Sequence, residues 1–523
     1  MGVQLDSRLW WDHHRTKIEE RATERLTALA ALASSTWGTG MINLRHVYRA
    51  MVVPQMLFGC SAWYNPGDAR TNSRKATVVA VARVQKRAAQ IITGAFRTTA
   101  GAALDVESYL LPAPQLLEKT ALEATMRIRT TPLYTEIAEP YNIGGHSGRV
   151  RHRSSSLSHF SSVLVRKFKV QLNQLEKRQP HPVPPWWKAP SVQISLSAEE
   201  AIREHDSTKP GVIRIYTDGS GINGHVGAAA VTLSQPENGV RTKRLEYMGT
   251  ANTSTVYAAE LRGVVLALQI LRDVQARTGS PGACVIFTDN QAALRALREP
   301  KCPSGQYILI EAVKLLDELR QAGWDVHFRW IPAHSGVVGN EAADRAAKEA
   351  ADLPSDSIVV RQEDSQPRIL TAALKVIIRR ALKAEWEHAW ETAKHGRELF
   401  RLGVRPGKGL LKMHTKQHRA ISSVITQMRV NKIGTRSYLH AINRSDTDRC
   451  DCGRGPETVR HILLECRKWV EERQRMWAGR QPCVDIKRIL CSPDKAVLAA
   501  KMLIRTGRLE QFRAVPSKVL EYA

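Results

Sequence analysis

Apolar positions recur every three or four residues through the first quarter of the chain. The segments IEERATERLTALAALA (18–33) and TVVAVARVQKRAAQIITGAF (77–96) show this spacing, so residues 1–140 are predicted to be helical. The pattern then breaks. Residues 141–210 combine a stretch rich in Ser and Arg with the proline-rich RQPHPVPPWWKAP (178–190), and this composition is typical of a linker.

From Gly211 onward the pattern changes to strands. Three strand-like segments follow one another, a long helix comes next, and two further strands alternate with helices. The predicted strands are VIRIYTDGS (212–220), HVGAAAVTLS (225–234), RTKRLEYMGT (241–250), ACVIFTDN (283–290) and DVHFRWIPA (325–333). We expect Ser254 to cap the long helix and Asn340 to cap the last one. Residues 211–352 are therefore predicted to form an α/β domain, with a mixed five-stranded sheet and helices on both faces.

After residue 352 the pattern is again mainly helical and basic. We expect a basic helical region over 353–440, a segment with clustered Cys and His over 441–480, and a C-terminal helical tail over 481–523. The α/β domain is thus predicted to be flanked by mainly α-helical segments.

Charge is distributed unevenly along the chain. The 77 Lys and Arg residues against 50 Asp and Glu residues give a formal net charge of +27. Residues 1–210 carry a net charge of +11 and residues 351–523 carry +15, whereas residues 211–350 carry only +1. Such a surplus points to a polyanionic partner, so we predict that the flanks bind nucleic acid.

Several classes of protein are disfavoured. Eight cysteines in 523 residues do not form the dense pattern of a secreted disulfide framework. The N-terminal MGVQLDSRLWWDHH has no signal-peptide pattern, and the longest apolar run, residues 51–63, is too short to span a bilayer. We expect an intracellular, soluble protein without a membrane partner.

Four acidic residues recur at strand ends or on helices of the α/β segment. They are Asp218, Glu260, Asp289 and Asp344. Taken singly, each is an ordinary turn or helix residue. If they converge, two carboxylates about 4 Å apart repel each other by about 4 kcal/mol at an effective dielectric constant of about 20, so the site needs cations. Oxygen ligands favour Mg²⁺ or Mn²⁺, and a carboxylate site with two metal ions is suited to phosphodiester hydrolysis.

The motifs YTDGS, AAELRGVVLAL, FTDNQAAL and HSGVVGNEAAD resemble the four acidic motifs of type I ribonuclease H, in the order of that family. The resemblance covers residues 211–352 and implies the ribonuclease H fold. It implies that Asp218, Glu260, Asp289 and Asp344 bind two Mg²⁺ ions. It also implies hydrolysis of the RNA strand of RNA–DNA hybrids, leaving 5′-phosphate and 3′-hydroxyl ends.

The last of these motifs holds two further candidate residues. His334 matches the loop histidine of the family, which assists proton transfer or product departure. Glu341 is expected to interact with the helix dipole rather than with a metal ion. The resemblance has one departure, because only two helices, joined by EPKCPSGQ (299–306), are predicted between Asp289 and Trp324. The extra helix and basic loop with which some ribonucleases H grip the hybrid are not expected here.

A second cluster of candidate ligands lies near the C-terminus. Cys450, Cys452, His461 and Cys466 follow the spacing C-x-C-x8-H-x4-C. Three thiolates and one imidazole form a tetrahedral zinc shell, so we expect Zn²⁺ here. The alternative is a helical hairpin with incidental buried cysteines.

The N-terminal region resembles the part that follows the polymerase palm in LINE-type (non-LTR) retrotransposon reverse transcriptases. The resemblance is carried by residues 2–14, 35–64 and 84–114. Elements of this class, particularly fungal ones, often carry ribonuclease H next and then a Cys/His segment, and their origin implies a nuclear location. No Asp-Asp pair occurs in the sequence. We therefore expect the C-terminal piece of a larger element protein that lacks the polymerase site.

Two alternative functions are considered. The first is a catalytically inactive, nucleic-acid-binding remnant of a retroelement, in which the basic helices and the Cys/His segment still act. The second is a polynucleotidyl transferase of the transposase or integrase type on the same fold. The position of Glu260 on the long helix after three strands favours ribonuclease H over the second alternative.

Overall fold

The computed structural model describes residues 2–7, 10–34, 37–66, 71–134, 156–234, 240–301, 304–353 and 368–522. The chain divides into two compact units. The first, here called the helical unit, comprises Met1–Leu122, Arg153–Phe160 and Arg380–Ala523. The second, here called the sheet unit, comprises Glu123–His152 and Ser161–Arg379.

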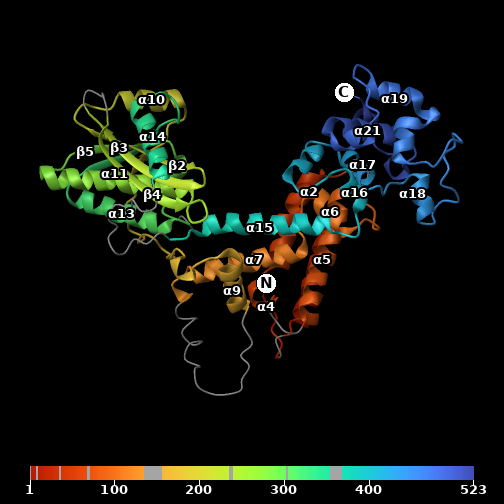
Figure 1. The fold of residues 1–523 in the computed structure, drawn as a ribbon, viewed down its shortest axis with the longest axis horizontal. Coiled ribbons are helices and arrows are strands. Elements are labelled where there is room, and N and C mark those ends of the chain that lie inside the picture. The colour runs from red at the N-terminus through yellow and green to blue at the C-terminus, as the bar shows by residue number, and fades with distance from the viewer. Residues whose placement is uncertain are drawn as a thin grey trace. The chain divides into compact units, whose positions relative to one another are not determined.

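In its described residues, the sheet unit contains one mixed sheet of six strands in the order β1-β6-β5-β2-β3-β4 (Figure 1). The strands are β1 (Ser191–Gln193), β2 (Ile213–Ile222), β3 (His225–Leu233), β4 (Val240–Thr250), β5 (Ala283–Thr288) and β6 (Asp325–Trp330). β2, β3 and β4 form the predicted antiparallel meander. β5 pairs in parallel with β2, β6 with β5, and β1 with β6.

The predicted class, a mixed α/β sheet with helices on both faces, is confirmed, and all five strands predicted within residues 211–352 are present, but a sixth strand from outside that range joins the sheet. The sixth strand, β1, comes from the segment predicted as a linker. It spans three residues between proline-rich sequence and a turn, which is too short to display the two-residue period that identifies a strand. Residues 141–155 of that predicted linker lie outside the described residues, and the predicted domain boundaries stay predictions.

Alternating side chains of the strands divide the core of the sheet unit into two layers. Ile215 and Ile286 pack in one apolar cluster, and their strand neighbours Tyr216 and Phe287 pack in the other. The first cluster contains α11 (Val256–Thr278), α12 (Gln291–Arg298) and α13 (Gln306–Gln321), and the second contains α14 (Val338–Asp352) with α10 (Ala198–Asp206) beside it. Both faces of the central strands are therefore covered.

Two predicted helix caps are wrong. The N-cap of α11 is Thr255, whose hydroxyl accepts a hydrogen bond from the backbone N–H of Ala258 at 3.2 Å, so Ser254 stands one residue outside. Adjacent Ser and Thr residues are equally good caps, and the sequence does not distinguish them. α14 begins at Val338, and Asn340 lies buried in its first turn instead of capping it.

A buried carboxylate attaches the segment around residue 176 to the sheet unit. Glu176 is fully buried and accepts hydrogen bonds from the backbone N–H groups of Gly305 and Thr371 and from the hydroxyl groups of Ser304 and Thr371. Leu175 also forms a parallel bridge with Ile369. This part of the predicted linker thus belongs to the sheet unit.

The helical unit is built from short and medium helices, as its sequence pattern predicts. Its α-helices are α1 (Asp12–Ala31), α2 (Met41–Val47), α3 (Val53–Met56), α4 (Cys60–Trp63), α5 (Thr71–Thr93), α6 (Gly101–Glu107), α16 (Arg397–Arg401), α17 (Arg419–Arg429), α18 (Arg436–Ala441), α19 (Val470–Trp477), α20 (Ile486–Cys491) and α21 (Pro493–Arg505). Three further helices, α7 (Ala113–Arg129), α9 (Ser156–Phe168) and α15 (Thr371–Glu391), contain residues of both units. The shorter 3₁₀ and π segments are η1 (Tyr48–Val52), η2 (Leu172–Gln174), η3 (Lys408–His414), η4 (His461–Glu465), η5 (Arg467–Trp469), η6 (Glu510–Phe512) and η7 (Ser517–Leu520).

A buried ion pair joins the N-terminal part of the helical unit to its C-terminal part. The Arg429 Nε donates to Glu107 Oε1 at 2.7 Å, and its Nη1 donates to the carbonyl of Leu490 at 2.7 Å. Both charged side chains are only 1% exposed. Within the described ranges, every helix falls short of the length or the apolar character that a membrane span requires.

We expect Glu176→Ala to destabilise the sheet unit by about 3 kcal/mol, because its buried donors would lose a charged acceptor. Urea unfolding followed by tryptophan fluorescence measures this change. The exposed Glu318, on α13 of the same unit, provides the matched control, and Glu318→Ala should change the free energy of unfolding by about 0.5 kcal/mol or less. Equal losses in the two variants would contradict the role given to Glu176.

Candidate active site

Three of the four predicted acids meet beside the end of β5. Asp218 lies in β2, Glu260 on α11 and Asp289 directly after β5, and one carboxylate oxygen of each lies within 4.8 Å of the others. Asp218 and Glu260 are buried, with 7% and 5% of their surface exposed, and Asp289 is half-buried.

The strand register explains this convergence. β2 and β5 are parallel neighbours in which Thr217 pairs with Thr288, so the next residues, Asp218 and Asp289, lie at the same level of the sheet. α11 can come close to β2 because residue 219 is glycine. A Cβ atom there would lie 2.5 Å from the backbone nitrogen of Glu260, which is closer than a real contact allows.

Burial and mutual repulsion oppose ionisation of these carboxyl groups. Burial, followed by the charges of Asp218 and Asp289, raises the pKa of Glu260 to about 9. Burial, followed by the charges of Asp289 and Asp344, raises the pKa of Asp218 to about 6. Burial also raises the pKa of Asp289. Without a cation, Glu260 therefore retains at neutral pH a proton that a free carboxyl group would release.

Asp344 belongs to a neighbouring group. Its carboxylate lies with the side chains of His334 and Glu341, again with one ligand atom of each within 4.8 Å of the others. Lys348 donates to Asp344 Oδ2 at 2.7 Å. The structure thus divides the predicted quartet into a trio and one acid beside it. It places Glu341 in this second group, although the sequence predicts only an interaction of Glu341 with the helix dipole.

The predicted loop histidine stands in a conformation that few non-glycine residues adopt. His334 is exposed and has a φ of 50°, in the left-handed region. It lies close enough to Asp289 for its charge to lower the pKa of that carboxyl group. His334 is therefore placed at the open side of the acidic trio.

Two asparagines that the sequence analysis did not assign to the site contact the acids. Asn290 caps α12 by accepting from the backbone N–H groups of Ala292 and Ala293, and its side chain also hydrogen-bonds Glu260. The side chain of Asn340 hydrogen-bonds Asp289. For Asn290, the sequence does contain a signal for a place in the site, namely its position directly after Asp289. For Asn340 it contains none, because the first turn of α14 has the sequence of an ordinary helix start.

The trio suits a divalent cation. The ligand atoms are carboxylate oxygens only, which is the donor set that Mg²⁺ and Mn²⁺ prefer. In addition, Glu260 Oε2 is a buried oxygen atom without a hydrogen-bond partner among the described residues. A buried carboxylate oxygen in this condition is costly unless a cation compensates it.

The family model for RNase H matches residues 210–352. The chain contains an RNase H domain. As predicted, α12 and α13 follow each other directly in the described part of this domain, without a helix between them.

Two curated relatives each match somewhat more than a quarter of the chain. The Gag-Pol polyprotein of bovine immunodeficiency virus (strain R29) is 29% identical over 157 residues, which cover 29% of this chain and 9% of the polyprotein. The ribonuclease H of Actinobacillus succinogenes is 26% identical over 153 residues, which cover 27% of this chain and 92% of that enzyme. Among solved structures, ribonuclease H1 of the archaeon Halobacterium salinarum is 21% identical, with a TM-score of 0.21, over 27% of this chain and 98% of that protein.

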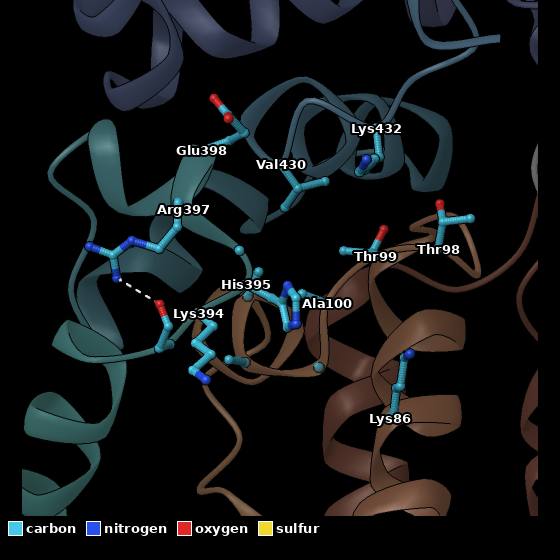
Figure 2. Close-up of a pocket in the computed structure, with 15 residues that line it drawn as sticks. Lys86, Thr98, Thr99, Ala100, Lys394, His395, Arg397, Glu398, Val430 and Lys432 are labelled. Atoms are coloured by element: carbon cyan, nitrogen blue, oxygen red, sulfur yellow. Dashed lines mark hydrogen bonds between the residues drawn. The ribbon is translucent and has the colours of Figure 1, made fainter. Parts of the chain in front are cut away.

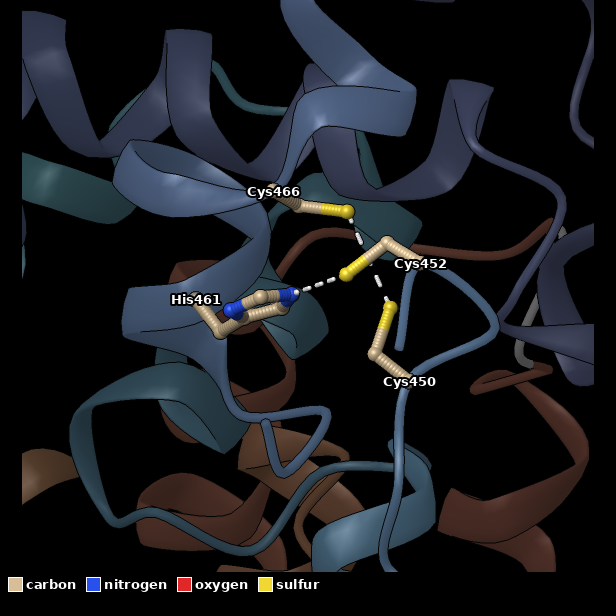
Figure 3. Close-up of side chains that lie close together, drawn as sticks. All are labelled: Cys450, Cys452, His461 and Cys466. Carbon is tan, nitrogen blue, oxygen red and sulfur yellow. Dashed lines mark hydrogen bonds between the residues drawn. The ribbon is translucent and has the colours of Figure 1, made fainter. Parts of the chain in front are cut away.

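The predicted Cys/His cluster assembles in the helical unit (Figure 3). One ligand atom from each of Cys450, Cys452, His461 and Cys466 lies within 4.8 Å of the others. The Sγ atoms of Cys450 and Cys466 are 3.7 Å apart, and Cys452 Sγ lies 3.2 Å from His461 Nε2. Three sulfur atoms and one imidazole nitrogen at this spacing match the donor set of a structural zinc site.

Polar neighbours of Cys452 and His461 favour the binding of a cation by these two side chains. Hydrogen bonds from the Arg454 backbone and from His461 lower the pKa of the Cys452 thiol. Glu465 Oε2 lies 3.7 Å from His461 Nδ1, on the side of the ring away from Cys452. A carboxylate at this position orients a ligating histidine.

We expect the stability of the metal-free protein to fall with rising pH because of Glu260. Its pKa in the folded state, about 9, exceeds the ordinary value of 4.5 that applies to the unfolded chain. The folded chain then holds a proton that the unfolded chain has released, so stability is lost progressively from about pH 4.5 to about pH 9. Glu260→Gln removes this loss.

Thermal melting in EDTA tests this prediction. The Glu260→Gln variant should melt above the wild type at pH 8, and each 1 kcal/mol gained corresponds to about 2–4 °C in a domain of this size. The difference should disappear near pH 4.5. The exposed Glu349 serves as the control position, and Glu349→Gln should show no such pH dependence. A gain that is equal at both pH values would contradict the prediction.

Proposed function

We propose that this chain is a metal-dependent ribonuclease H that cleaves the RNA strand of RNA–DNA hybrids internally and leaves 5′-phosphate and 3′-hydroxyl ends. The observation that carries the proposal is the buried trio of Asp218, Glu260 and Asp289 inside an RNase H domain. Three carboxylates within 4.8 Å are unfavourable as a purely structural feature, since their repulsion stabilises nothing in the fold.

Asp218, Glu260 and Asp289 would hold Mg²⁺, with Asp344 beside them, and Mn²⁺ fits the same oxygen donors. The bound ions would supply Lewis-acid activation of the phosphate and of a water molecule. Asn290 and Asn340 would keep the carboxylates of Glu260 and Asp289 in position through their hydrogen bonds. The protein groups would thus provide a preorganised negative site that accepts cations and a phosphodiester together.

His334 would move a proton or assist the departure of the product. Its imidazole is exposed beside Glu341 and Asp344, so it can reach a substrate without breaking a buried contact. Histidine is suited to this task because its ordinary pKa lies close to neutrality.

The rival proposal is a nucleic-acid-binding remnant without catalytic activity. The basic flanks and the Cys/His cluster would account for such a protein without any nuclease. The presence of all four acids together with His334 favours the enzyme.

We also propose a retroelement origin. The match to a viral Gag-Pol polyprotein is consistent with this origin, and the LINE-type resemblance of the N-terminal region adds the element class. The polymerase site would then lie outside this chain, and a nuclear location follows from the same origin. Hybrid RNA–DNA is the nucleic acid that such an element produces.

We further propose that Cys450, Cys452, His461 and Cys466 hold one Zn²⁺ ion. Its role would be structural, because all four protein ligands would be used and no position would remain open for a substrate.

The Asp289→Asn variant tests the proposed activity. It removes one negative oxygen ligand but keeps the shape of the side chain, so we expect cleavage of a labelled RNA–DNA hybrid in Mg²⁺ to fall by about 100-fold or more. Asp325→Asn, at the exposed start of β6, removes the same charge elsewhere and should leave the rate unchanged. If the wild-type chain does not cleave the hybrid, the binding remnant becomes the better proposal.

Elemental analysis tests the zinc site. The purified chain should contain about one zinc ion, and Cys466→Ser should lower both the zinc content and the melting temperature. Cys491→Ser is the matched control, since Cys491 lies outside the cluster in the same unit and donates only to the Leu402 carbonyl. A zinc-free wild type whose melting temperature is insensitive to chelators would exclude the site.

A further inference from the structure

A pocket of about 740 Å³ opens in the helical unit, away from the Cys/His cluster (Figure 2). Three stretches of chain that are distant in sequence line it. One is α5 with the loop that follows it and the start of α6, the second is the loop before α16 with the start of that helix, and the third is the short stretch after α17. Its volume lies within the range of about 300–1,000 Å³ that is typical of ligand sites.

The lining of this pocket is strongly basic. Its basic side chains are Lys86, Lys394, His395, Arg397 and Lys432. The one acid that lines it, Glu398, accepts from Arg401 at 2.5 Å and is thereby compensated. Among the described residues, no carboxylate forms an ion pair with Lys86, Lys394 or Lys432.

The remaining wall is small and neutral. Thr98 and Thr99 contribute hydroxyl groups, and Ala100, Gly101 and Ala102 continue the lining. These short side chains leave space between the basic groups, which Figure 2 shows on opposite sides: Lys86 and Lys432 on one side, and Lys394 and Arg397 on the other.

Parts of the pocket are fixed by contacts outside it. Arg397 Nη1 donates to the carbonyl groups of Trp390, Glu391 and Ala393, and its guanidinium lies 3.6 Å from the centre of the Phe400 ring. Lys432 Nζ lies 5.2 Å from the centre of the Tyr438 ring, whose hydroxyl is 2.5 Å from Thr98 Oγ1. Two of the cations therefore keep their positions without a bound anion.

We propose that this pocket binds phosphate groups of a nucleic-acid strand. Several uncompensated cations around a cavity repel one another, so an anion between them would be stabilised by all of them. Cations from three separate stretches of chain can contact successive phosphates, and the lysines serve as point charges for them.

The choice of nucleic acid as the ligand rests on the proposed ribonuclease function. Residues 211–350, which hold the RNase H domain, carry a net charge of only +1, whereas residues 351–523 carry +15. Neutralisation of phosphates dominates the affinity of proteins for nucleic acids. The pocket would accordingly supply affinity for the substrate strand that the RNase H domain lacks.

The test compares two double variants of the full chain that lose the same charge. Lys394→Gln with Lys432→Gln removes two pocket cations. Lys408→Gln with Lys518→Gln removes two exposed lysines of the same unit outside the pocket. Binding of a fluorescein-labelled RNA–DNA hybrid is measured in EDTA, which prevents cleavage, at salt concentrations between about 50 and 200 mM.

We expect the pocket variant to reduce the slope of log K against log salt by about one to two, since each phosphate contact contributes about 0.9 to the slope. Its affinity at low salt should fall several-fold, whereas the control variant should stay near the wild type. Equal slopes for the two variants would overturn the proposal, provided that their melting temperatures match.

The binding result is independent of the cleavage result. If the wild type fails to cleave but the salt dependence of hybrid binding is weaker in the pocket variant, the ribonuclease proposal is wrong and the phosphate pocket stands.

A further measurement with inorganic phosphate distinguishes the two possible sources of the anion, which are a nucleic-acid strand and the free phosphate ion. If the two variants bind the hybrid equally, while inorganic phosphate raises the melting temperature of the control variant and not that of the pocket variant, the pocket is a site for the free ion, and the assignment to a nucleic-acid strand is overturned.

Discussion

The repulsion among three close carboxyl groups, two of them buried and one half-buried, is the constraint on which the RNase H domain depends. Asp218, Glu260 and Asp289 lie within 4.8 Å of one another at the ligand atoms, and their burial raises the pKa of each. Such an arrangement costs free energy in the absence of cations, so the remainder of the domain must hold it in place. The register between β2 and β5, the missing side chain at Gly219 and the hydrogen bonds of two asparagines all serve this purpose.

The helical unit depends on a different interaction, a buried ion pair between its N-terminal and its C-terminal part. Glu107 and Arg429 are separated by 322 positions and meet in a buried ion pair. Removal of one partner from such a pair typically costs about 3–5 kcal/mol, since the other charge stays buried and unpaired. The pair lies between the helices that carry the basic pocket, with α6 on one side and α17 on the other. The geometry of the pocket consequently depends on an interaction that neither end of the chain can form alone.

The sequence predicted the elements with strong periodicity and missed features that depend on tertiary contacts. The meander, the helices on both faces and the grouping of Asp218, Glu260 and Asp289 follow from motifs with regular spacing. β1 was missed because three residues carry no periodic signal, and its pairing depends on an open edge of β6. The sequence predicts a helix cap at Asn340. Its contact with Asp289 cannot be predicted from the sequence, because that contact exists only in the folded domain. The position of Asp344 beside the trio likewise depends on how α14 packs, which spacing alone does not specify.

Under the proposed function, the uneven charge would divide recognition and chemistry between different parts of the chain, because residues 211–350 carry a net charge of +1 and residues 351–523 carry +15. A site that concentrates negative carboxylates repels a polyanionic substrate until cations bind, and a nearly neutral surface around it offers little long-range attraction. Additional basic residues close to the trio would improve attraction, but they would also pair with the carboxylates, as Lys348 pairs with Asp344, and such pairs would compete with metal ions. Placing the basic surplus in the flanks avoids this competition. Under the proposed function, cations of the flanks would hold the substrate, and the carboxylates would stay available for metal ions.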